Sequence, residues 1–356
     1  MVSSPPGGSS TRWPLPRTTV VTGATGWLGT ALVHRLVADP QRTQLRLLAQ
    51  SGAAADQLLA LTADRRGVEI IIGDISKADT AARLMHGLGA DVDVLHTAGV
   101  IHPRRVRDFY TVNENGTRHL VAAAFDAGVR RFVHVSSNSP FGVNPDSNDT
   151  FRHKEPFNPY LGYGKSKMQA ELTIEQAVAA GLDATIVRPP WFYGPFQPPR
   201  QTTFFRMVRR GKFPIIGAGG QRRSMVYIDN LIDGMFCAEL TPAARGNGYW
   251  IADQQAHTVA EIVATVGKAL ADEGFTVEPP TTHVPAVVAR VAELGDRLLQ
   301  GVGLYQQQLH VLGEMGHTIA VDISQSTAEI GYVPTVELYE GMRRSIRWCR
   351  EQGFEL

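Results

Sequence analysis

A glycine-rich turn near the start of the chain constrains the fold more than any other feature. Thr18–Thr22, which is rich in β-branched residues, predicts a buried strand. The turn Gly23-Ala24-Thr25-Gly26-Trp27-Leu28-Gly29 follows directly and leads into a helix. Glycines here let the backbone turn sharply, let a pyrophosphate approach the amides and let the helix pack on the strand. The helix N-terminus then offers free N–H groups and a partial positive charge to an anion.

Short apolar runs alternate with helical patterns over the segment that follows. The predicted strands cover 18–22, 44–49, 68–72, 92–96, 131–136 and 184–188, and the predicted helices lie near 27–38, 54–63, 78–87, 107–127 and 163–180. This alternation predicts an α/β fold with a doubly wound parallel Rossmann sheet over 17–188. We expect 189–356 to form a smaller substrate-binding lobe interleaved with it. Residues 1–16, rich in Ser, Pro and Gly, are expected to be a flexible tail.

Charge and composition exclude several classes of protein. The 35 basic and 34 acidic residues give a net charge of +1, which disfavours a nucleic-acid partner. No run approaches the length of apolar sequence that spans a membrane, so no membrane span is expected. The two cysteines supply neither a disulfide framework nor a cysteine zinc site, and the 11 histidines form no ligand-spaced cluster. We therefore expect no metal, and a location in the reducing cytoplasm.

The glycines Gly23, Gly26 and Gly29 are spaced three and three apart, and this spacing resembles the TGxxGxxG signature of extended short-chain dehydrogenases/reductases, the NAD-dependent epimerase/dehydratase superfamily. Three further segments share the resemblance: Gly73-Asp74-Ile75, His96-Thr97-Ala98-Gly99 and Val112–Thr117. The resemblance implies that Asn113 shapes the active-site backbone. It also implies cofactor contacts from Gly23, Thr25, Gly26, Trp27, Leu28, Gly29, Asp74, Ile75, Thr97, Ala98 and Gly99.

The end of the second strand separates NAD from NADP only weakly. NAD enzymes usually place an acidic residue there to hold the ribose hydroxyls. This chain has Ala49 at that place and Gln50 where many relatives carry Arg, while Arg46 lies nearby, either as a phosphate ligand or as a solvated strand residue. The pattern leans slightly to NADP.

Tyr163 and Lys167 stand four residues apart at the start of a predicted helix, so both can address one ligand. A phenol with an ordinary pKa of about 10 is a poor base at neutral pH. A nearby ammonium and a positive nicotinamide would bring that pKa toward the working range. The pair matches the YxxxK motif of the resembling superfamily, which implies proton transfer by Tyr163 and cofactor contacts from both residues. A solvated helix face is the bland alternative.

The strand Phe132–Val135 runs into Ser136-Ser137-Asn138. In the resembling family a serine at this strand end hydrogen-bonds the substrate oxygen, and the following Phe141-Gly142 favours Ser137 over Ser136. Asn138 beside it is a candidate substrate contact. Dehydratases carry Thr-Asp-Glu here, so the sequence disfavours dehydration.

Two later segments resemble the substrate side of the family. Arg188–Pro195 looks like the stretch that closes over nicotinamide, which implies cofactor contacts from Pro189 and Pro190 and a substrate contact from Phe192. A simple packed loop is the alternative. Within Arg222–Asn230, Arg223 matches the arginine that grips the diphosphate in nucleotide-sugar epimerases, and a structural salt bridge is equally open.

The stretch 285–317 shifts the choice of substrate. Apolar residues recur at helical spacing, which predicts an amphipathic helix (Val287, Val291, Leu294, Leu298 and Val302). Together with the later Ile330–Pro334 it resembles the 3β-hydroxysteroid dehydrogenase-like branch, which implies apolar cover over the site and a lipophilic small-molecule alcohol or ketone. A core helix or a dimer-contact helix is the alternative. A nucleotide-sugar epimerase and a non-catalytic dinucleotide sensor remain rival functions, and a homodimer through 107–127 and 163–180 is usual for the family.

Overall fold

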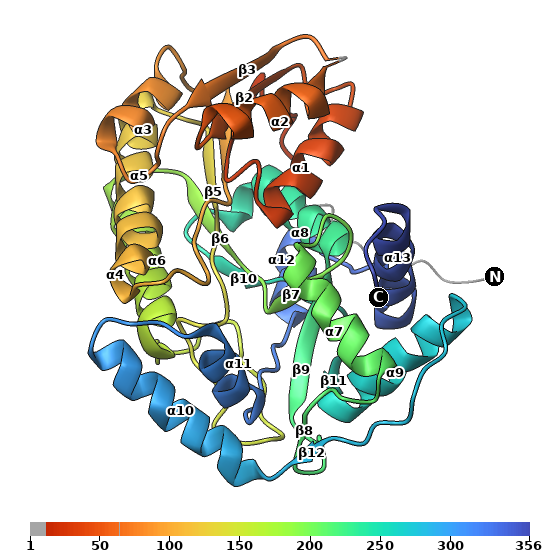
Figure 1. Ribbon diagram of the computed structural model, residues 1–356. Helices are drawn as coiled ribbons and strands as arrows, with labels where there is room; N and C mark the ends of the chain where they lie inside the picture. Colours follow the sequence, from red (N-terminus) through yellow and green to blue (C-terminus); the bar gives the residue numbers. More distant parts are fainter. Residues whose placement is uncertain (1–11, 64) are drawn as a thin grey trace, which may run out of the picture.

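A seven-stranded parallel sheet organises the molecule, and the computed structural model describes residues 12–63 and 65–356 (Figure 1). The strand order is β10-β6-β5-β4-β1-β2-β3, and every pair is parallel. The strands are β1 (Thr18–Thr22), β2 (Gln44–Ala49), β3 (Val68–Ile72), β4 (Val92–His96), β5 (Arg131–Val135), β6 (Ala184–Arg188) and β10 (Gly248–Trp250). The predicted doubly wound Rossmann sheet is confirmed.

Helices cover both faces of this sheet, each face with its own buried apolar cluster. One face carries α1 (Trp27–Ala38), α2 (Gly52–Thr62) and α8 (Ile228–Leu240). The other carries α3 (Ala78–Met85), α5 (Thr117–Ala127) and α6 (Leu161–Ala180). The short α4 (Val106–Phe109) and a π-helical turn, η1 (Tyr110–Gly116), lead into α5.

The chain beyond β6 builds a second region below the sheet in Figure 1. It contains a three-stranded sheet of β7 (Trp191–Tyr193), β9 (Arg222–Tyr227) and β11 (Ala256–Thr258), and a pair of β8 (Ile215–Ile216) and β12 (His283–Val284). Its other helices are α7 (Pro199–Arg209), η2 (Pro242–Ala244), α9 (Val259–Asp272), α10 (Ala286–Gly301), α11 (Gln307–Met315), α12 (Ser324–Ile330) and α13 (Leu338–Glu351). Because β10 and α8 join the main sheet, the two regions are interleaved.

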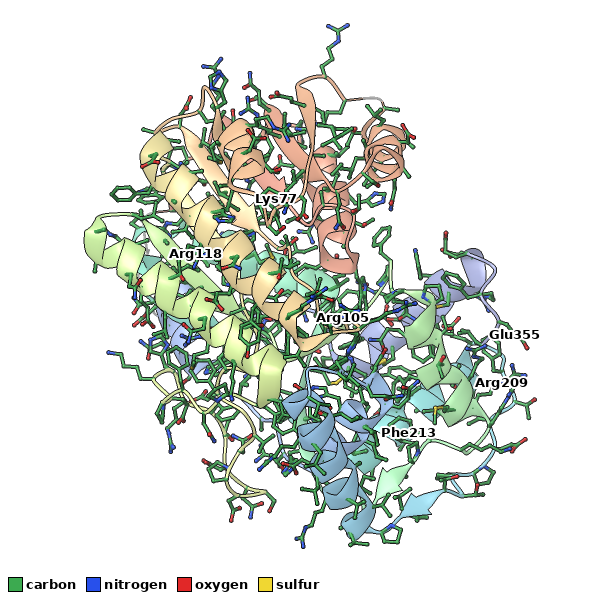
Figure 2. The ribbon with its side chains drawn as sticks, turned by 60° about the vertical axis from the view of Figure 1, so that its left-hand side comes forward. Lys77, Arg105, Arg118, Arg209, Phe213 and Glu355 are labelled. Atoms are coloured by element: carbon green, nitrogen blue, oxygen red, sulfur yellow. The ribbon has the colours of Figure 1, made fainter. Side chains whose placement is uncertain are left out.

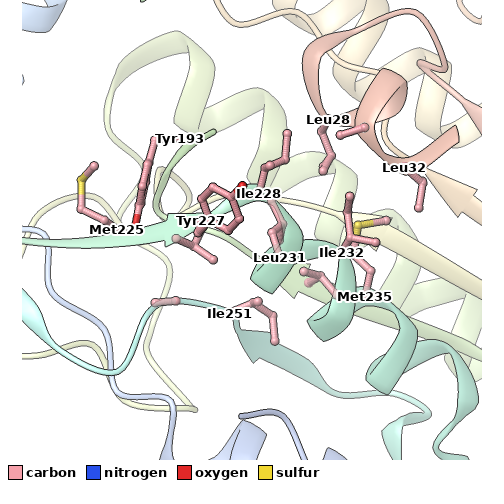
Figure 3. Packing of buried hydrophobic residues seen from close by; sticks show 14 of the residues in the cluster. Leu28, Leu32, Tyr193, Met225, Tyr227, Ile228, Leu231, Ile232, Met235 and Ile251 are labelled. Atoms are coloured by element: carbon pink, nitrogen blue, oxygen red, sulfur yellow. The ribbon is translucent and has the colours of Figure 1, made fainter. Parts of the chain in front are cut away.

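Helix α8 attaches the second region to the first by apolar packing and by ion pairs. Leu28 and Leu32 of α1 share a cluster with Leu231, Ile232 and Met235 of α8 (Figure 3). Fully buried apolar side chains of this size contribute on the order of 1.5–3 kcal/mol each.

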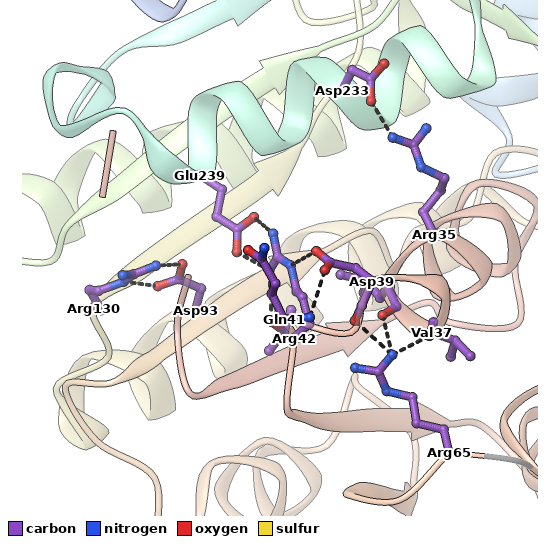
Figure 4. A network of polar contacts seen from close by, with 12 residues as sticks. Arg35, Val37, Asp39, Gln41, Arg42, Arg65, Asp93, Arg130, Asp233 and Glu239 are labelled. Carbon is purple, nitrogen blue, oxygen red and sulfur yellow. Dashed lines mark hydrogen bonds and ion pairs between the residues drawn. The ribbon is translucent and has the colours of Figure 1, made fainter. Parts of the chain in front are cut away.

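Two arginines of the N-terminal half pair with acidic residues of α8 (Figure 4). The buried Arg42 donates to both carboxylate oxygens of Glu239, at 2.7 and 2.6 Å, and Arg35 pairs with Asp233 at 2.6 Å. These contacts fix the position of α8 relative to the sheet.

The N-terminal segment differs partly from the prediction of a flexible tail. Residues 1–11 lie outside the described part of the chain. Residues 12–16 are described, and Trp13 among them packs against the domain. The Arg131 guanidinium lies 4.4 Å from the centre of the Trp13 ring, and the Trp13 amide donates to Leu240. Trp13 supplies an aromatic face for a buried cation, which composition alone did not reveal.

The helix predicted within 285–317 exists, but its apolar face is exposed, so this face neither covers the site nor belongs to a core helix; a dimer contact stays a prediction. Val287, Val291, Leu294, Leu298 and Val302 are 59–73% exposed. The side of α10 that faces the protein carries Ala289, Ala292 and Asp296 instead. Gly313 of α11 and Gly316 directly after it let the two helices approach closely, since a Cβ at Gly313 would lie 3.0 Å from the Glu293 Cα.

No helix within the described residues is both long enough and apolar enough to cross a bilayer.

Candidate active site

The glycine turn has no room for side chains. Gly23 has a φ of +70°, and a Cβ there would lie 2.6 Å from the Ala98 backbone nitrogen. A Cβ on Gly29 would lie 1.9 Å from the Gly23 carbonyl oxygen, while the Gly26 amide donates to that oxygen at 2.9 Å. Backbone therefore packs directly on backbone, as close approach of a pyrophosphate requires.

The N-terminus of α1 opens onto this turn. Gly26 is its N-cap residue, and no side chain caps the first turn. Uncapped amides and the helix dipole suit an anion, so the turn and the helix together fit the phosphates of a dinucleotide. Trp27 donates from Nε1 to the Pro195 carbonyl at 2.8 Å, and its ring centre lies 4.6 Å from that of Phe192. The phosphate loop thus contacts the segment after β6 directly.

The end of β2 presents no carboxylate. Ala49 is buried and Gln50 is exposed. Arg46 pairs with Glu69 at 2.7 Å and donates to the carbonyls of Leu84 and His86. The Arg46 guanidinium is therefore bonded to protein groups. It is neither a free phosphate ligand nor a solvated strand residue.

The segment after β3 packs against η1. Asp74 accepts a hydrogen bond from the Ser76 amide at 2.9 Å, so part of its role is to shape the turn. Ile75 is buried, and its side chain comes within 3.1 Å of where a Cβ on Gly116 would stand.

The turn after β4 is held to β1. Thr97 donates to the Thr22 carbonyl at 2.7 Å, and the Ala98 amide donates to the Thr22 hydroxyl at 3.4 Å. Gly99 is exposed at the rim. These residues therefore line the strand ends, where a doubly wound sheet binds ligands.

Asn113 joins three parts of the site from within the π-helical turn. Its side chain accepts from the Val100 amide at 2.8 Å and donates to the Val100 carbonyl at 3.0 Å. It also donates to the Ser166 hydroxyl at 3.1 Å, one residue from Lys167. The side chain is fully buried and ties η1 to the segment after β4 and to α6; its role in shaping the active site stays a prediction. π-Helical turns are rare and often lie at functional sites.

Tyr163, in the first turn of α6, lies beside Ser137, which follows the end of β5. The Ser137 side chain is near enough to the Tyr163 phenol to lower its pKa. The Ser137 hydroxyl lies 3.4 Å from Asn138 Oδ1 and 3.3 Å from Ser139 Oγ. Burial raises the pKa of Tyr163 to about 12; the nearby Ser137 side chain opposes the shift and the negative charge of Glu314 adds to it. The lowering expected from Lys167 and a nicotinamide stays a prediction, because burial dominates in the chain alone.

Lys167 is buried next to a histidine that the sequence reasoning missed. Its Nζ donates to the Val135 carbonyl at 2.7 Å and lies 3.2 Å from His134 Nε2. Burial lowers the pKa of Lys167 to about 8, and the charge of Glu171 partly offsets this. Burial, and then the charge of Lys167, hold the pKa of His134 well below its usual value. A neutral His134 can therefore accept a hydrogen bond from the Lys167 ammonium. The available signal in the sequence was a histidine inside the predicted strand 131–136, two residues before the serine at its end.

Unpartnered polar atoms occur on both neighbours of Ser137 and on the N-cap residue of α6. Within the described residues, Ser136 Oγ, Asn138 Nδ2 and Tyr160 Oη are buried without a hydrogen-bond partner. Buried polar atoms are nearly always bonded, to protein or to ordered water, so unpaired ones at a cleft suit a ligand or water.

The other residues expected to contact substrate lie in the segment after β6 and in β9, which is bonded to α11. Pro189 and Pro190 are buried, and Phe192 is half-buried against Trp27. Arg223 is buried and donates from Nη2 to the Glu314 carbonyl at 2.5 Å. Of the two alternatives for Arg223, a structural bond is thus observed, although its acceptor is a carbonyl oxygen and not a carboxylate.

A polar cluster inside the α10–α11 hairpin was also missed. Asp296 is fully buried, lies 2.8 Å from His310 Nδ1 and accepts from the Gln300 amide group at 3.0 Å. Gln300 in turn accepts from the Gly162 amide at 3.0 Å, next to Tyr163. The helical spacing of Glu293, Asp296 and Gln300 could have indicated this polar inner face.

Two surface hollows, of about 510 and 890 Å³, lie elsewhere. The first is lined by Val37, Arg42 and Arg65, and the second by Arg152, Arg222 and Asp322 among others. Neither hollow includes Tyr163, Lys167 or Ser137. We therefore locate the candidate site by its residues and their contacts, and not by these hollows.

The comparison with known families agrees with this geometry. The sequence profile of the NAD dependent epimerase/dehydratase family matches residues 19–252. The chain belongs to this family. It is thereby an extended short-chain dehydrogenase/reductase, a superfamily of NAD-dependent oxidoreductases, epimerases and dehydratases.

Individual relatives span most of the chain. Protein y4nL of Sinorhizobium fredii is 43% identical over 94% of this chain and 95% of its own length. A 4-hydroxy-2-methyl-3-oxo-4-farnesyl-3,4-dihydroquinoline-1-oxide ketoreductase of Stigmatella aurantiaca is 28% identical over 91% of this chain and 94% of its own. A UDP-glucose 4-epimerase of Vibrio cholerae is 26% identical over 93% and 95%.

Among solved structures, DesIV, a dTDP-glucose 4,6-dehydratase from Streptomyces venezuelae with NAD and TYD bound, superposes with a TM-score of 0.71. It is 25% identical to this chain, and the match covers 94% of this chain and 97% of DesIV. The relatives include both a ketoreductase and a sugar epimerase, so the family name leaves the substrate class open.

Proposed function

We propose that this family member is an NAD(P)-dependent dehydrogenase/reductase acting on a secondary alcohol or ketone of lipophilic, sterol-like character. The observation that carries the proposal is the contact of Tyr163 with Ser137 at the end of β5, with Lys167 on the same helix. The ketoreductase relative, whose named substrate carries a farnesyl group, supports a lipophilic ketone.

The residues divide the chemistry among themselves. A nicotinamide cofactor, when bound, supplies or accepts the hydride. Ser137 donates a hydrogen bond that orients the substrate oxygen. Tyr163 gives that oxygen a proton during reduction or removes one during oxidation. Lys167 holds positive charge near the phenol and stabilises its anionic form. His134 and the Val135 carbonyl hold the lysine in place.

Gly23, Gly26 and Gly29 would hold the cofactor's phosphates, and the end of β2 its adenosine ribose. Gln50 and the absence of a carboxylate at this strand end favour NADPH slightly over NADH. Because Arg46 is bonded to Glu69, it adds nothing to that preference. Measuring the two dissociation constants by quenching of tryptophan fluorescence decides the matter.

A row of aromatic rings in contact with one another runs from Tyr163 to the α10–α11 hairpin. The Phe109 ring centre lies 5.7 Å from that of Tyr163 and 5.3 Å from that of Tyr305. The Tyr305 ring lies 5.3 Å from His310, which lies 5.4 Å from Tyr160. Aromatic groups beside Tyr163 suit a flat apolar substrate.

The second candidate is a nucleotide-sugar epimerase, which the epimerase relative favours. Arg223 is the residue that would grip a diphosphate, but it is bonded to the Glu314 carbonyl. We therefore place this function second.

Native mass spectrometry of the purified protein, followed by turnover assays, tests the choice. Mostly empty protein that oxidises NADPH or NADH with sterol-like or aliphatic ketones supports the proposal. Retained stoichiometric NAD without net turnover, and with interconversion of nucleotide sugars, favours the epimerase.

Tyr163→Phe tests the mechanism, with Tyr339→Phe in α13 as its matched control. We expect Tyr163→Phe to lower kcat about 10³-fold while cofactor binding is retained, because general acid–base groups contribute about 10²–10⁴-fold. The control should retain full activity. Full activity in Tyr163→Phe would contradict the assigned proton transfer.

A further inference from the structure

The outward face of α10 is apolar. Together with the residues that follow the helix it presents six aliphatic side chains, each more than half exposed, which we call the outer stripe: Val287, Val291, Leu294, Leu298, Val302 and Leu304. Exposed aliphatic residues elsewhere in the described chain are scattered, for example Leu59 on α2 and Val333 after α12. A continuous apolar stripe on a polar surface marks a contact site.

The inner face of α10 prevents the helix from turning this stripe inward. Asp296 and Gln300 are bonded to His310 and Gly162, and Glu293 lies 3.0 Å from His317 Nε2. Rolling the helix would break all of these bonds and expose Asp296. The outward orientation of the stripe is therefore a property of the fold.

Arginines flank the outer stripe. Arg290 and Arg297 lie seven residues apart on α10 and are exposed, and Arg297 is paired with Glu293. At the other end, Arg105 bridges to Leu304 through the backbone, and Arg104 and Arg105 are exposed. Figure 2 shows Arg105 at the start of α4, above the blue α10–α11 hairpin.

We infer that the outer stripe docks on the surface of an anionic lipid bilayer, with α10 lying in the plane of the interface. An apolar helix face with cationic flanks is the pattern of interfacial helices, and anionic headgroups attract such flanks. A symmetric pairing of two copies through the stripe would bring like arginines together, which disfavours that partner.

The docking also gives a reason for the position of the hairpin. Its inner side reaches Gly162 beside Tyr163, so a docked enzyme holds its substrate side against the bilayer, where lipophilic ketones dissolve. This last step rests on the proposed function. The docking itself does not.

Co-sedimentation with vesicles, carried out without substrate, tests the docking on the full chain. The wild type should sediment with phosphatidylglycerol/phosphatidylcholine vesicles, and less with phosphatidylcholine alone. Leu294→Gln combined with Leu298→Gln should lower the partition coefficient about a hundredfold, roughly tenfold for each leucine. Leu59→Gln, a matched exposed leucine, should change nothing.

The arginines are tested separately. Arg290→Gln and Arg105→Gln should each lower binding to the anionic vesicles about fivefold and leave binding to neutral vesicles unchanged. Unchanged thermal unfolding confirms that each variant is folded.

Three results would overturn the inference: a wild type that does not sediment with anionic vesicles, leucine variants that bind like the wild type, or a wild-type dimer that dissociates in the double variant during sedimentation velocity. The last would make the stripe an interface between copies. None depends on turnover, so a failed ketone assay and a failed docking are distinguishable.

Discussion

The two sides of the active site are held together in different ways. On the cofactor side, Gly23 and Gly29 bring backbone against backbone, with no space for a Cβ. On the substrate side, Arg223 and Gln300 are held by hydrogen bonds to residues 91 and 138 positions away in the sequence. Backbone packing tolerates only glycine and so fixes one geometry, whereas side-chain pairing can be rebuilt to suit another substrate.

The strongest test of this contrast is Gly29→Ala. Its Cβ would overlap the Gly23 carbonyl, so we expect the free energy of unfolding to fall by about 3 kcal/mol or more and dinucleotide affinity to fall at least about a hundredfold. Urea unfolding and cofactor titration measure the two effects. Gly52→Ala, at the start of α2, has nothing within 4 Å and is the control. Equal behaviour of the two variants would contradict tight packing at the cofactor side.

A second test uses pH and the boundary between the two sides, where Lys167 lies. Its pKa is lowered in the folded chain from 10.5 to about 8. Between these values the unfolded chain binds the proton that the folded chain has released, so this lysine makes stability rise with pH, by about 3 kcal/mol over the whole window.

Lys167→Met should remove that rise, whereas the exposed Lys165→Met should keep it. Urea unfolding at intervals across the window measures the slope. A slope that persists in Lys167→Met would show that Lys167 is not the group that titrates.

The smallest expected effect is on the substrate side. Asp296→Ala leaves His310 and Gln300 without their shared partner, which should lower the free energy of unfolding by about 2 kcal/mol. Asp56→Ala, exposed on α2, should change it by less than about 0.5 kcal/mol. Because the hairpin borders the site, Asp296→Ala should also raise KM more than it lowers kcat. An unchanged KM would show that the α10–α11 hairpin does not contribute to substrate binding.

Much of the cofactor side could be predicted from the sequence because its signals are local. The strands β1 to β4 and β6 end where the apolar runs predicted, and β5 is one residue shorter. Glycine spacing indicated the phosphate loop. β10 was missed because three residues carry too little periodicity.

The substrate side could be predicted only in part. Helical spacing identified which residues of α10 share a face, but the same spacing fits an inward or an outward face. The bonds of Asp296 decide it, and they depend on α11. The partners of Arg223 and Lys167 likewise come from distant segments. Homodimerisation through α5 and α6 stays a prediction, since a single chain does not test it.

The position of β10 has a consequence for synthesis on the ribosome. β6 ends at Arg188, yet its outer neighbour in the sheet is not made until Trp250 has been translated. Until then the nascent chain presents β6 as an open edge, ready to pair with another strand. Pairing of β6 with β10 is expected to be slow, because the entropy of closing the long intervening loop is lost before the strand contacts form. A fragment ending at Arg188 should therefore aggregate, although it contains the complete phosphate loop.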